Sequence, residues 1–318
     1  MSVRSMVLEI LEQNRESDIS GERMAQQTGV SRNSVWKAIN ALRAEGYDIL
    51  SATNKGYRIA PDCDILSAEG IGVNMQAKIP VFVYKTTDST NVRAKQYLAE
   101  NECERAVFAA EEQTAGRGRL GRSFYSPYGK GVYMSYVFSP NTEVANAVSV
   151  TAAASVAVVR ALEKLLGVHA MIKWVNDIYV DNKKLCGILT EAVTNYETGI
   201  VSHIVIGIGV NFSTDVFPDD IAETACSLGV YSGVTRNMLI AQISDNLTQI
   251  TQDLEDRSYF ETYRERMLVL GHDITYYADG KSYAAHAVDV DTGGGLVVCD
   301  DNGNEKILRS GEITVRLR

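Results

Sequence analysis

Cysteine and histidine are scarce in this chain of 318 residues. The five cysteines are odd in number, scattered and without C-x-x-C spacing, which is typical of a protein from a reducing cytoplasm. The four histidines show no metal-ligand spacing, so each is expected to be structural or exposed. The sequence therefore leaves the ligands of any metal unknown.

Long hydrophobic runs are missing as well. The longest apolar stretch, Ala147 to Val159, contains Ser and Thr and stops at Arg160, whereas a helix needs about 20 apolar residues to cross a bilayer. A buried helix is the better interpretation of this stretch. The N-terminus shows no signal-peptide pattern. We therefore expect a cytoplasmic protein with no membrane partner.

A general excess of basic residues is also absent. The net charge of −9 argues against a chain that coats nucleic acid along its whole length. The charge is uneven, because eight basic and seven acidic residues up to Ala60 give +1, and the remainder carries −10. A near-neutral head on an acidic body permits DNA binding by the head and suggests another task for the body.

The chain divides into three parts of an α+β protein. We expect a winged helix-turn-helix at 1–62, a mixed α/β domain at 66–270 and a small β-barrel at 271–318, with a polar joint at Pro61–Asp64. Gly-containing turns such as Asp279–Gly280 separate the short strands of the tail. In the middle part, the periodicity predicts helices at Val144–Leu166 (ended by Gly167), Met238–Leu254 and Tyr259–Met267, and strands at Trp174–Val180, Leu185–Ala192 and Ile200–Val210.

Residues Gly21 to Gly46 have the pattern of a helix-turn-helix. A first helix over Gly21–Thr28 is followed by a turn at Gly29-Val30, and Ser31 is well placed to cap the second helix. A wing is expected where Asp48–Ser51 and Tyr57–Ala60 pair around 53–56. The candidate DNA contacts are Ser31, Arg32, Asn33, Ser34, Lys37, Asn40 and Lys55. A winged helix used only for protein contacts is the alternative.

The most informative stretch is a loop at 116–123 that contains three arginines and three glycines, Gly-Arg-Gly-Arg-Leu-Gly-Arg-Ser. It formally satisfies G-x-G-x-x-G and nearly satisfies the P-loop pattern, but the strand-like run 132–138 follows it instead of a helix. Position 141 is also Asn, where a dinucleotide site needs an acidic residue. Glycine allows close backbone approach, and arginine pairs with phosphate or carboxylate oxygens, so the loop suits an enclosed anion. A solvated basic loop or an RNA-binding segment is the alternative.

Other motifs accompany this loop in a fixed order. They are Asp88-Ser89-Thr90-Asn91, Gln113, Lys173-Trp174-Val175-Asn176-Asp177, Lys184-Leu185-Cys186-Gly187-Ile188-Leu189 and Gly207-Ile208-Gly209-Val210-Asn211. Together with the glycine–arginine loop they resemble the motifs of biotin protein ligases. Val175 replaces the usual proline, for which we expect a small local change. With its head and tail, the chain resembles the bifunctional bacterial ligase that also represses biotin-synthesis genes.

The resemblance implies an SH3-like barrel in the tail and a ligase that uses biotin, ATP and Mg²⁺. Such an enzyme forms biotinyl-AMP and transfers biotin to a lysine of the carrier domain of acetyl-CoA carboxylase or a related enzyme. The resemblance also implies binding of operator DNA by a homodimer that biotinyl-AMP favours. The implied catalytic residues are Lys184, Arg119, Asp177 and Lys173; the biotin-binding residues are Ser89, Thr90, Asn91, Gln113, Arg117, Gly118, Arg119 and Lys184; and the nucleotide-binding residues are Arg122, Asn176, Asn211 and Arg316.

Several alternatives stay open at this point. Ser89 and Asn91 can serve as helix caps, and Lys173 and Lys184 can be solvated, Lys184 on a turn between strands. Trp36 and Trp174 are expected to be packing residues. A lipoate–protein ligase, or a repressor that binds an effector without catalysis, are the competing functions, although the neutral polar cluster and the arginine-rich loop favour biotin.

Overall fold

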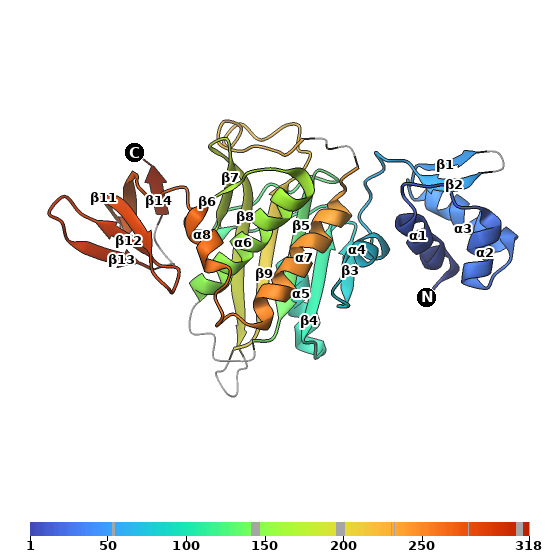
Figure 1. Cartoon of the computed structure of the whole chain (residues 1–318), viewed down its shortest axis with the longest axis horizontal. Coiled ribbons are helices and arrows are strands. Elements are labelled where there is room, and N and C mark those ends of the chain that lie inside the picture. The colour runs from blue at the N-terminus through green and yellow to red at the C-terminus, as the bar shows by residue number, and fades with distance from the viewer. Residues whose placement is uncertain are drawn as a thin grey trace.

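The computed structural model describes residues 1–52, 55–140, 147–194, 201–229, 231, 233–278 and 280–309, together with the backbone of 314–317. The chain forms three parts in a row, with the two termini at opposite ends of the molecule (Figure 1). The expected order of head, mixed α/β domain and small β domain is confirmed. The exact domain limits stay predictions. Within the described residues, no helix is long and apolar enough to cross a membrane.

The head is a winged helix-turn-helix. Gly29 has φ 68°, the left-handed conformation that ends α2, and the Ser31 hydroxyl accepts a hydrogen bond of 3.1 Å from the Ser34 N–H, which caps α3. Both local predictions are therefore confirmed, whereas Thr53 and Asn54 at the tip of the wing lie outside the described residues. The elements are α1 Val3–Gln13, α2 Gly21–Thr28, α3 Arg32–Ala44, β1 Ile49–Ala52 and β2 Gly56–Ile59.

The central domain is built on a seven-stranded sheet in the order β3-β4-β5-β9-β8-β7-β6, in which only β3 and β4 are parallel. Its strands are β3 Val81–Tyr84, β4 Arg105–Ala110, β5 Gly131–Phe138, β6 Met171–Lys173, β7 Asp177–Val180, β8 Lys183–Thr194 and β9 Val201–Asn211. Its helices are α4 Ala68–Asn74, α5 Thr90–Glu100, the 3₁₀ turn η1 Arg119–Gly121, α6 Ala147–Leu166, α7 Arg236–Gln252 and α8 Phe260–Glu265.

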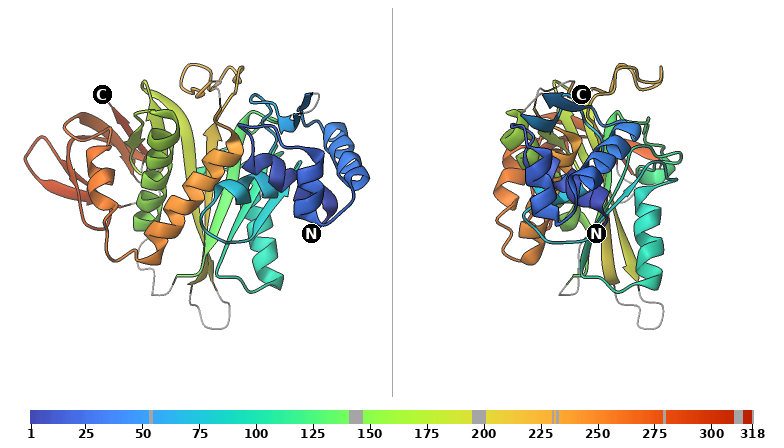
Figure 2. Two further views of the ribbon diagram at one scale, coloured as in Figure 1. Left: turned by 45° about the vertical axis from the view of Figure 1, so that its right-hand side comes forward. Right: turned by 90° about the vertical axis from the view of Figure 1, so that its right-hand side faces the viewer.

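The two faces of the sheet are covered differently. Helices α6 and α7 lie side by side on one face, and α5 covers the other (Figure 2). Alternate residues of β5 follow this division, since Met134 and Tyr136 belong to the core beneath α6 and α7 while Val137 packs on the side of α5. The apolar stretch, whose side chains are described from residue 148 on, is thus the buried helix that the sequence predicts.

The tail is a five-stranded antiparallel sheet in the order β13-β12-β11-β10-β14. The Trp174 indole N–H donates a 2.9 Å hydrogen bond to the carbonyl of Gly294, which fastens the tail to the central domain. Asp279, in one of the expected turns, lies outside the described residues. The strands are β10 Asp273–Ala278, β11 Lys281–Val290, β12 Leu296–Cys299, β13 Glu305–Leu308 and β14 Thr314–Leu317.

Two local predictions are wrong. Residues 174–176 form a turn between β6 and β7 rather than the beginning of a strand, because Lys173 pairs directly with Asp177 across this hairpin. Val175 therefore occupies a turn, and its peptide bond to Trp174 is cis. Lys184 lies inside β8, not on the preceding turn, which Asp181 and Asn182 make with positive φ. Of the predicted helix at 144–166, residues 144–146 lie outside the described residues.

Candidate active site and DNA-reading helix

A cavity of about 750 Å³ opens on the face of the sheet that α5 covers. Three glycines on neighbouring strands, Gly187, Gly207 and Gly209, form part of its floor. A Cβ atom at position 207 would lie 2.4 Å from Asn91 Oδ1, and one at position 209 would lie 2.5 Å from the Phe124 ring. These two positions therefore require glycine, because a larger residue would displace the groups that shape the cavity.

The cavity brings together most of the residues that the motifs singled out. Asn211 is not among the lining residues; its side-chain amide donates to the Cys226 carbonyl at 3.0 Å and so fastens the segment after β9. Arg316 belongs to β14, but its side chain lies outside the described residues. The predicted residues that line the cavity are Ser89, Thr90, Asn91, Gln113, Arg117, Gly118, Arg119, Arg122, Lys173, Asn176, Asp177 and Lys184.

A neutral polar group lies at the beginning of α5. Gln113 accepts a 2.9 Å hydrogen bond from the Thr90 N–H through Oε1 and donates one of 3.1 Å to the Ser126 hydroxyl through Nε2. Ser89 is the N-cap residue, yet its side chain makes no capping bond. Capping therefore does not use the Ser89 hydroxyl, which borders the cavity and is available to a polar ligand.

Asn91 is held more tightly than its motif suggests. Its Nδ2 donates to Glu191 Oε2 at 2.7 Å, and its Oδ1 accepts a hydrogen bond from the Ser135 hydroxyl. Glu191 in turn pairs with Lys95 at 2.6 Å. Because both ends of the amide are occupied, Asn91 shapes the floor above Gly207. Sequence reasoning missed Glu191 and Ser135, since neither belongs to a motif and both meet Asn91 only through the fold.

The glycine–arginine loop folds back on itself beside the cavity. The Gly118 N–H donates to the Arg122 carbonyl at 2.7 Å, and the Phe124 N–H donates to the Gly116 carbonyl at 2.9 Å. Arg119 reaches out of the loop and donates a 3.1 Å hydrogen bond to Asn176 Oδ1. Burial lowers the pKa of Arg119, and the nearby Asp177 carboxylate opposes this change, but an arginine still remains a cation at neutral pH. The loop thus places a partly desolvated positive charge against the β6–β7 turn.

A second cation lies close to that turn. Lys184 Nζ is 2.7 Å from Asp177 Oδ1, and the backbone of Lys184 is fixed by the Thr224 carbonyl and the Cys226 N–H. The side chain is therefore aimed from a fixed strand into the cavity. It is not a freely solvated turn lysine.

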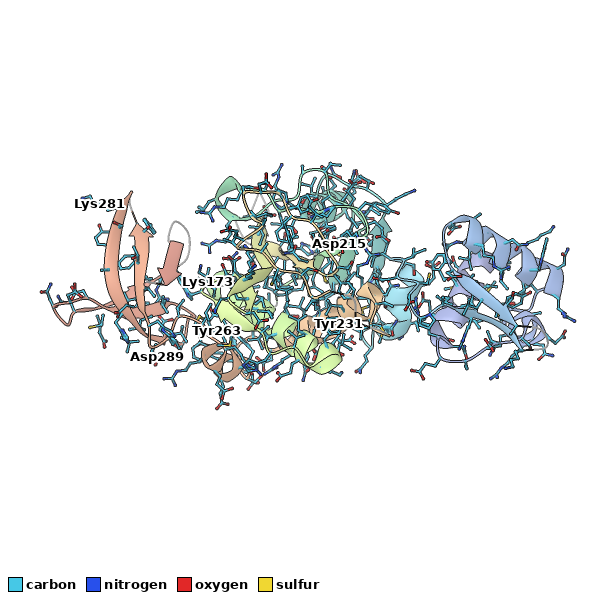
Figure 3. The ribbon with its side chains drawn as sticks, turned by 90° about the horizontal axis from the view of Figure 1, so that it is seen from above. Lys173, Asp215, Tyr231, Tyr263, Lys281 and Asp289 are labelled. Atoms are coloured by element: carbon cyan, nitrogen blue, oxygen red, sulfur yellow. The ribbon has the colours of Figure 1, made fainter. Side chains whose placement is uncertain are left out.

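Lys173 lies on the side of the central domain nearest the tail (Figure 3). Its Nζ is 3.4 Å from the Tyr179 hydroxyl and 5.1 Å from the centre of that ring. Burial raises the pKa of Tyr179 to about 12, so the phenol stays protonated at neutral pH. Sequence reasoning missed Tyr179, which follows the Lys-Trp-Val-Asn-Asp motif by two residues and lines the same cavity.

The acidic residues of the cavity fit Mg²⁺ only in company with phosphate. Within the described ranges, no group of three or more His, Cys, Asp or Glu could hold a metal by itself. Asp177 and Asp220 both line the cavity. Since Mg²⁺ in nucleotide sites usually takes one or two carboxylates and several phosphate oxygens, these two residues suit a metal that arrives with a nucleotide.

Helix α3 presents a mixed basic and aromatic face to solvent. Arg32, Asn33 and Lys37 are exposed, as is Lys55 on the wing, whereas Ser34 and Asn40 are half-buried. Trp36 is 54% exposed on the same helix, so the expectation that it packs in the core is wrong. The helical register gives the reason, because Val35, Ala38, Ile39 and Leu42 form the buried face and Trp36 falls between Asn33 and Asn40 on the opposite one. Trp174 is buried, as expected.

Comparison with known proteins agrees with both features, the cavity of the central domain and the helix-turn-helix of the head. Residues 83–211 match the biotin/lipoate A/B protein ligase family, and residues 4–58 match a helix-turn-helix domain. The bifunctional ligase/repressor BirA of Bacillus spizizenii is 35% identical over 237 residues, which are 73% of this chain and 72% of that protein. The chain belongs to the biotin protein ligase family, in its bifunctional ligase/repressor form.

Two further relatives extend the likeness. The bifunctional ligase/repressor BirA of Escherichia coli is 28% identical over 302 residues, which span 93% of this chain and 92% of that protein, so the match extends into both the head and the tail. The structure of the Aquifex aeolicus biotin protein ligase in complex with biotin and ATP has a TM-score of 0.66 and 26% identity, covering 75% of this chain and 99% of that one.

Proposed function

We propose that this protein joins biotin to a lysine of a biotin carrier domain through biotinyl-AMP, and that its head represses transcription from operator DNA. One observation carries the enzymatic part: the neutral polar group at Ser89, Thr90 and Gln113 and the cations Arg119 and Lys184 line the same cavity. A ligand with an uncharged polar ring at one end and a carboxylate at the other matches this arrangement.

The reaction needs activation of the biotin carboxylate, because hydroxide is a poor leaving group. A carboxylate oxygen attacks the α-phosphorus of ATP, the bond to pyrophosphate breaks, and a mixed anhydride with AMP forms. The amine of the acceptor lysine then attacks the acyl carbon, AMP leaves with the electrons of the broken C–O bond, and the amine loses a proton. The chemistry requires no protein nucleophile, so positioning and charge neutralisation by the enzyme carry the catalysis.

Two cations have the strongest claim to that neutralisation. Lys184 is aimed into the cavity from a fixed strand, and Arg119 is directed at the β6–β7 turn through Asn176. Both can bind the oxygens shared by the carboxylate and the α-phosphate. Asp177 holds Lys184 until substrate arrives. Lys173, steadied by Tyr179, adds positive charge at the tail side of the cavity.

The nucleotide is proposed to extend along the loop and the turn. Arg122 and Asn176 line the cavity there, and Asp177 or Asp220 would hold Mg²⁺, which would supply positive charge against the phosphates. Asn211 supports this region from behind, through its bond to the Cys226 carbonyl. Arg316 stays a proposed nucleotide contact on the basis of its motif position.

Lipoate is the alternative substrate, because the matched family includes lipoate ligases. Its dithiolane ring has no N–H or C=O groups, so it would offer the Ser89 hydroxyl no hydrogen-bond partner, whereas a ureido ring both donates and accepts hydrogen bonds. The relative from Aquifex aeolicus binds biotin and ATP. These observations favour biotin.

The repressor role rests on the head. The exposed face of α3 combines Arg32, Asn33, Trp36 and Lys37, and a relative named ligase/repressor matches 93% of this chain. A homodimer that places two heads on two half-sites, stabilised by biotinyl-AMP, completes the proposal. We place the protein in the cytoplasm because its five cysteines are unpaired.

The enzymatic proposal is tested with purified full-length protein, radiolabelled biotin, ATP–Mg²⁺ and a biotin carrier domain. We expect label in the carrier that depends on ATP, and no comparable transfer when lipoate replaces biotin. Transfer of lipoate at an equal or higher rate would reverse the substrate assignment. A repressor without catalysis would bind biotin and release no pyrophosphate.

A further inference from the structure

The segment that connects the head to the central domain is bound along its whole length. Residues 63–67 form neither helix nor strand, yet Cys63, Leu66 and Ser67 are buried. A flexible tether between domains is normally exposed and polar. The connecting segment is therefore not a flexible tether.

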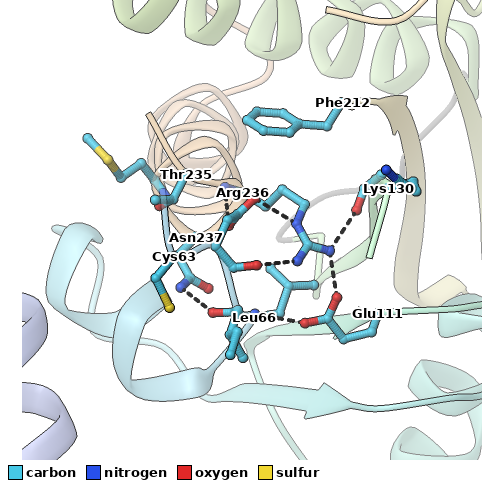
Figure 4. Close-up of polar contacts among 12 residues, drawn as sticks. Cys63, Leu66, Glu111, Lys130, Phe212, Thr235, Arg236 and Asn237 are labelled. Atoms are coloured by element: carbon cyan, nitrogen blue, oxygen red, sulfur yellow. Dashed lines mark hydrogen bonds and ion pairs between the residues drawn. The ribbon is translucent and has the colours of Figure 1, made fainter. Parts of the chain in front are cut away.

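Arg236, at the first position of α7, makes the central contact with this segment (Figure 4). Its side chain is 2% exposed. Its backbone N–H donates to Asp64 Oδ1 at 3.0 Å, and its guanidinium donates to Asp64 Oδ2 at 2.9 Å and to the Asp64 carbonyl at 2.7 Å. The same guanidinium pairs with Glu111 Oε2 at 2.6 Å. One arginine thus holds both the side chain and the backbone of the connecting segment.

Asn237 and Glu111 continue this arrangement on either side. Asn237 donates to the Ile65 carbonyl at 2.9 Å and accepts from the Ser67 N–H at 3.1 Å. Glu111 uses its other oxygen to accept from the Leu66 N–H at 2.9 Å. A buried ion pair is stable only when its geometry is good and its remaining donors and acceptors are satisfied. This network therefore allows the backbone of the connecting segment to follow only one path.

The head is fastened to the same segment from the other side. Arg15, which follows the end of α1, donates to the Cys63 carbonyl at 2.9 Å, and Arg4 bridges from α1 to Glu69 of α4 at 3.1 Å. The head is therefore held to the central domain both through the segment and by a direct ion pair. We call Asp64, Glu111, Arg236 and Asn237 the clasp.

We propose that the clasp fixes the head in one position on the central domain and thereby sets the separation of the two DNA half-sites that a dimer can bind together. The inference rests on the proposed repressor function. When two binding modules are joined rigidly, the second module reaches its site only if the geometry matches, whereas a flexible linker accepts a range of separations. Loosening the clasp should broaden the accepted spacings without changing the bases that α3 reads.

The test uses full-length protein with a non-hydrolysable biotinyl-AMP analogue. A duplex that the wild type binds is first selected from a random pool, and base pairs are then added to or removed from its centre, up to about half a helical turn. We expect the wild type to prefer one spacing by at least about a hundredfold, in keeping with the gain from bivalent binding. We expect Asp64→Ala to reduce this preference to about tenfold or less.

Glu163→Ala is the matched control. It removes the carboxylate that pairs with another arginine of the same domain, Arg266, at a site away from the connecting segment. It should keep the wild-type preference. Hydrogen exchange of the Leu66 and Ser67 amides gives a second readout, and these amides should exchange faster in Asp64→Ala only. If Asp64→Ala does not fold, Arg236→Lys, which keeps the charge and loses the forked contact, replaces it.

The outcomes separate the two proposals. A wild type that selects no duplex overturns the repressor function and this inference with it. A wild type that discriminates between spacings, together with an Asp64→Ala variant that discriminates equally well while its Leu66 amide has been freed, overturns the role of the clasp alone.

Discussion

Lys184 and Asp177 face each other across the β7–β8 hairpin, with Nζ and Oδ1 2.7 Å apart. The two side chains are 35% and 23% exposed, so water screens the pair and it contributes only about 0–1 kcal/mol to stability. An arriving carboxylate or phosphate can therefore compete for Lys184. In the site without ligand, the Asp177 carboxylate therefore keeps the Lys184 side chain in place.

Replacing Lys184 by alanine should slow pyrophosphate release with biotin and ATP by at least about a hundredfold, the scale of losing one charged transition-state contact. The fold should persist, because the ion pair is weak. Lys183→Ala is the control, since this exposed neighbour begins the same strand. A Lys184→Ala rate equal to that of the control removes Lys184 from the site.

Replacing Arg119 by glycine should let biotinyl-AMP escape, because the change deletes the cation that contacts Asn176 and adds backbone freedom. The released anhydride would then acylate unrelated lysines, seen as biotin on a bystander such as albumin. Leu120→Gly adds backbone freedom to the same loop while it keeps the Arg119 cation, and its φ of 56° suits glycine. Equal bystander labelling by both variants would assign the effect to loop flexibility.

The sequence predicts much of this architecture because its signals are local. Helix ends at Gly29 and Gly167 need a left-handed residue, and the cap at Ser31 needs only its own helix. The motifs also identify many of the residues that line the cavity, although Asn211 is not among them.

The errors have a physical pattern. The turn at 174–176 is set by the pairing of Lys173 with Asp177. The sequence alone does not show this pairing, and the apolar residues of the turn are equally typical of a strand. The hydrogen bond that occupies the Asn91 amide nitrogen is made to Glu191, which is 100 residues away in the sequence. Trp36 was assigned to the core from its residue type alone, whereas the helical register places it outside. Long-range pairing and register, rather than composition, decide these positions.

Deleting residues 1–61 should abolish operator binding and leave adenylation within about tenfold of wild type. The clasp, the cavity and its loop all lie beyond this cut, and the deletion removes the contacts that the head makes with the connecting segment and α4, including those of Arg4 and Arg15. The measurement is pyrophosphate release by a truncated protein whose circular dichroism shows a folded domain. Complete loss of adenylation in such a protein would show that the head helps to build the site.

Replacing Trp36 by alanine should weaken binding to a selected operator by roughly tenfold or more, because a contact to a base is worth ~1–3 kcal/mol. Binding to unrelated DNA and its salt dependence should change little, since these depend on phosphate contacts. The chain has two tryptophans, and Trp174 is buried, so a change of fluorescence on adding operator reports on Trp36. Unchanged operator affinity would leave Trp36 as an exposed residue without a role in recognition.

The last prediction concerns how the ligand controls DNA binding. A single head with a net charge of +1 makes few phosphate contacts and should bind DNA weakly alone, whereas two heads on a dimer engage two half-sites and gain affinity through effective concentration. Biotinyl-AMP can favour the dimer if ordering the glycine–arginine loop around it removes entropy that dimerisation would otherwise have to remove.

By linkage, operator DNA should then tighten binding of biotinyl-AMP, and a carrier domain that consumes the intermediate should release the operator. Sedimentation equilibrium with and without a non-hydrolysable biotinyl-AMP analogue measures the first step, and we expect the dimerisation constant to rise by about 5- to 150-fold, the usual range of such coupling. Arg119→Gly, in which the loop holds the ligand poorly, should show a smaller rise at the same analogue concentration. A constant that the analogue leaves unchanged in the wild type would mean that the intermediate acts on the heads by some route other than assembly.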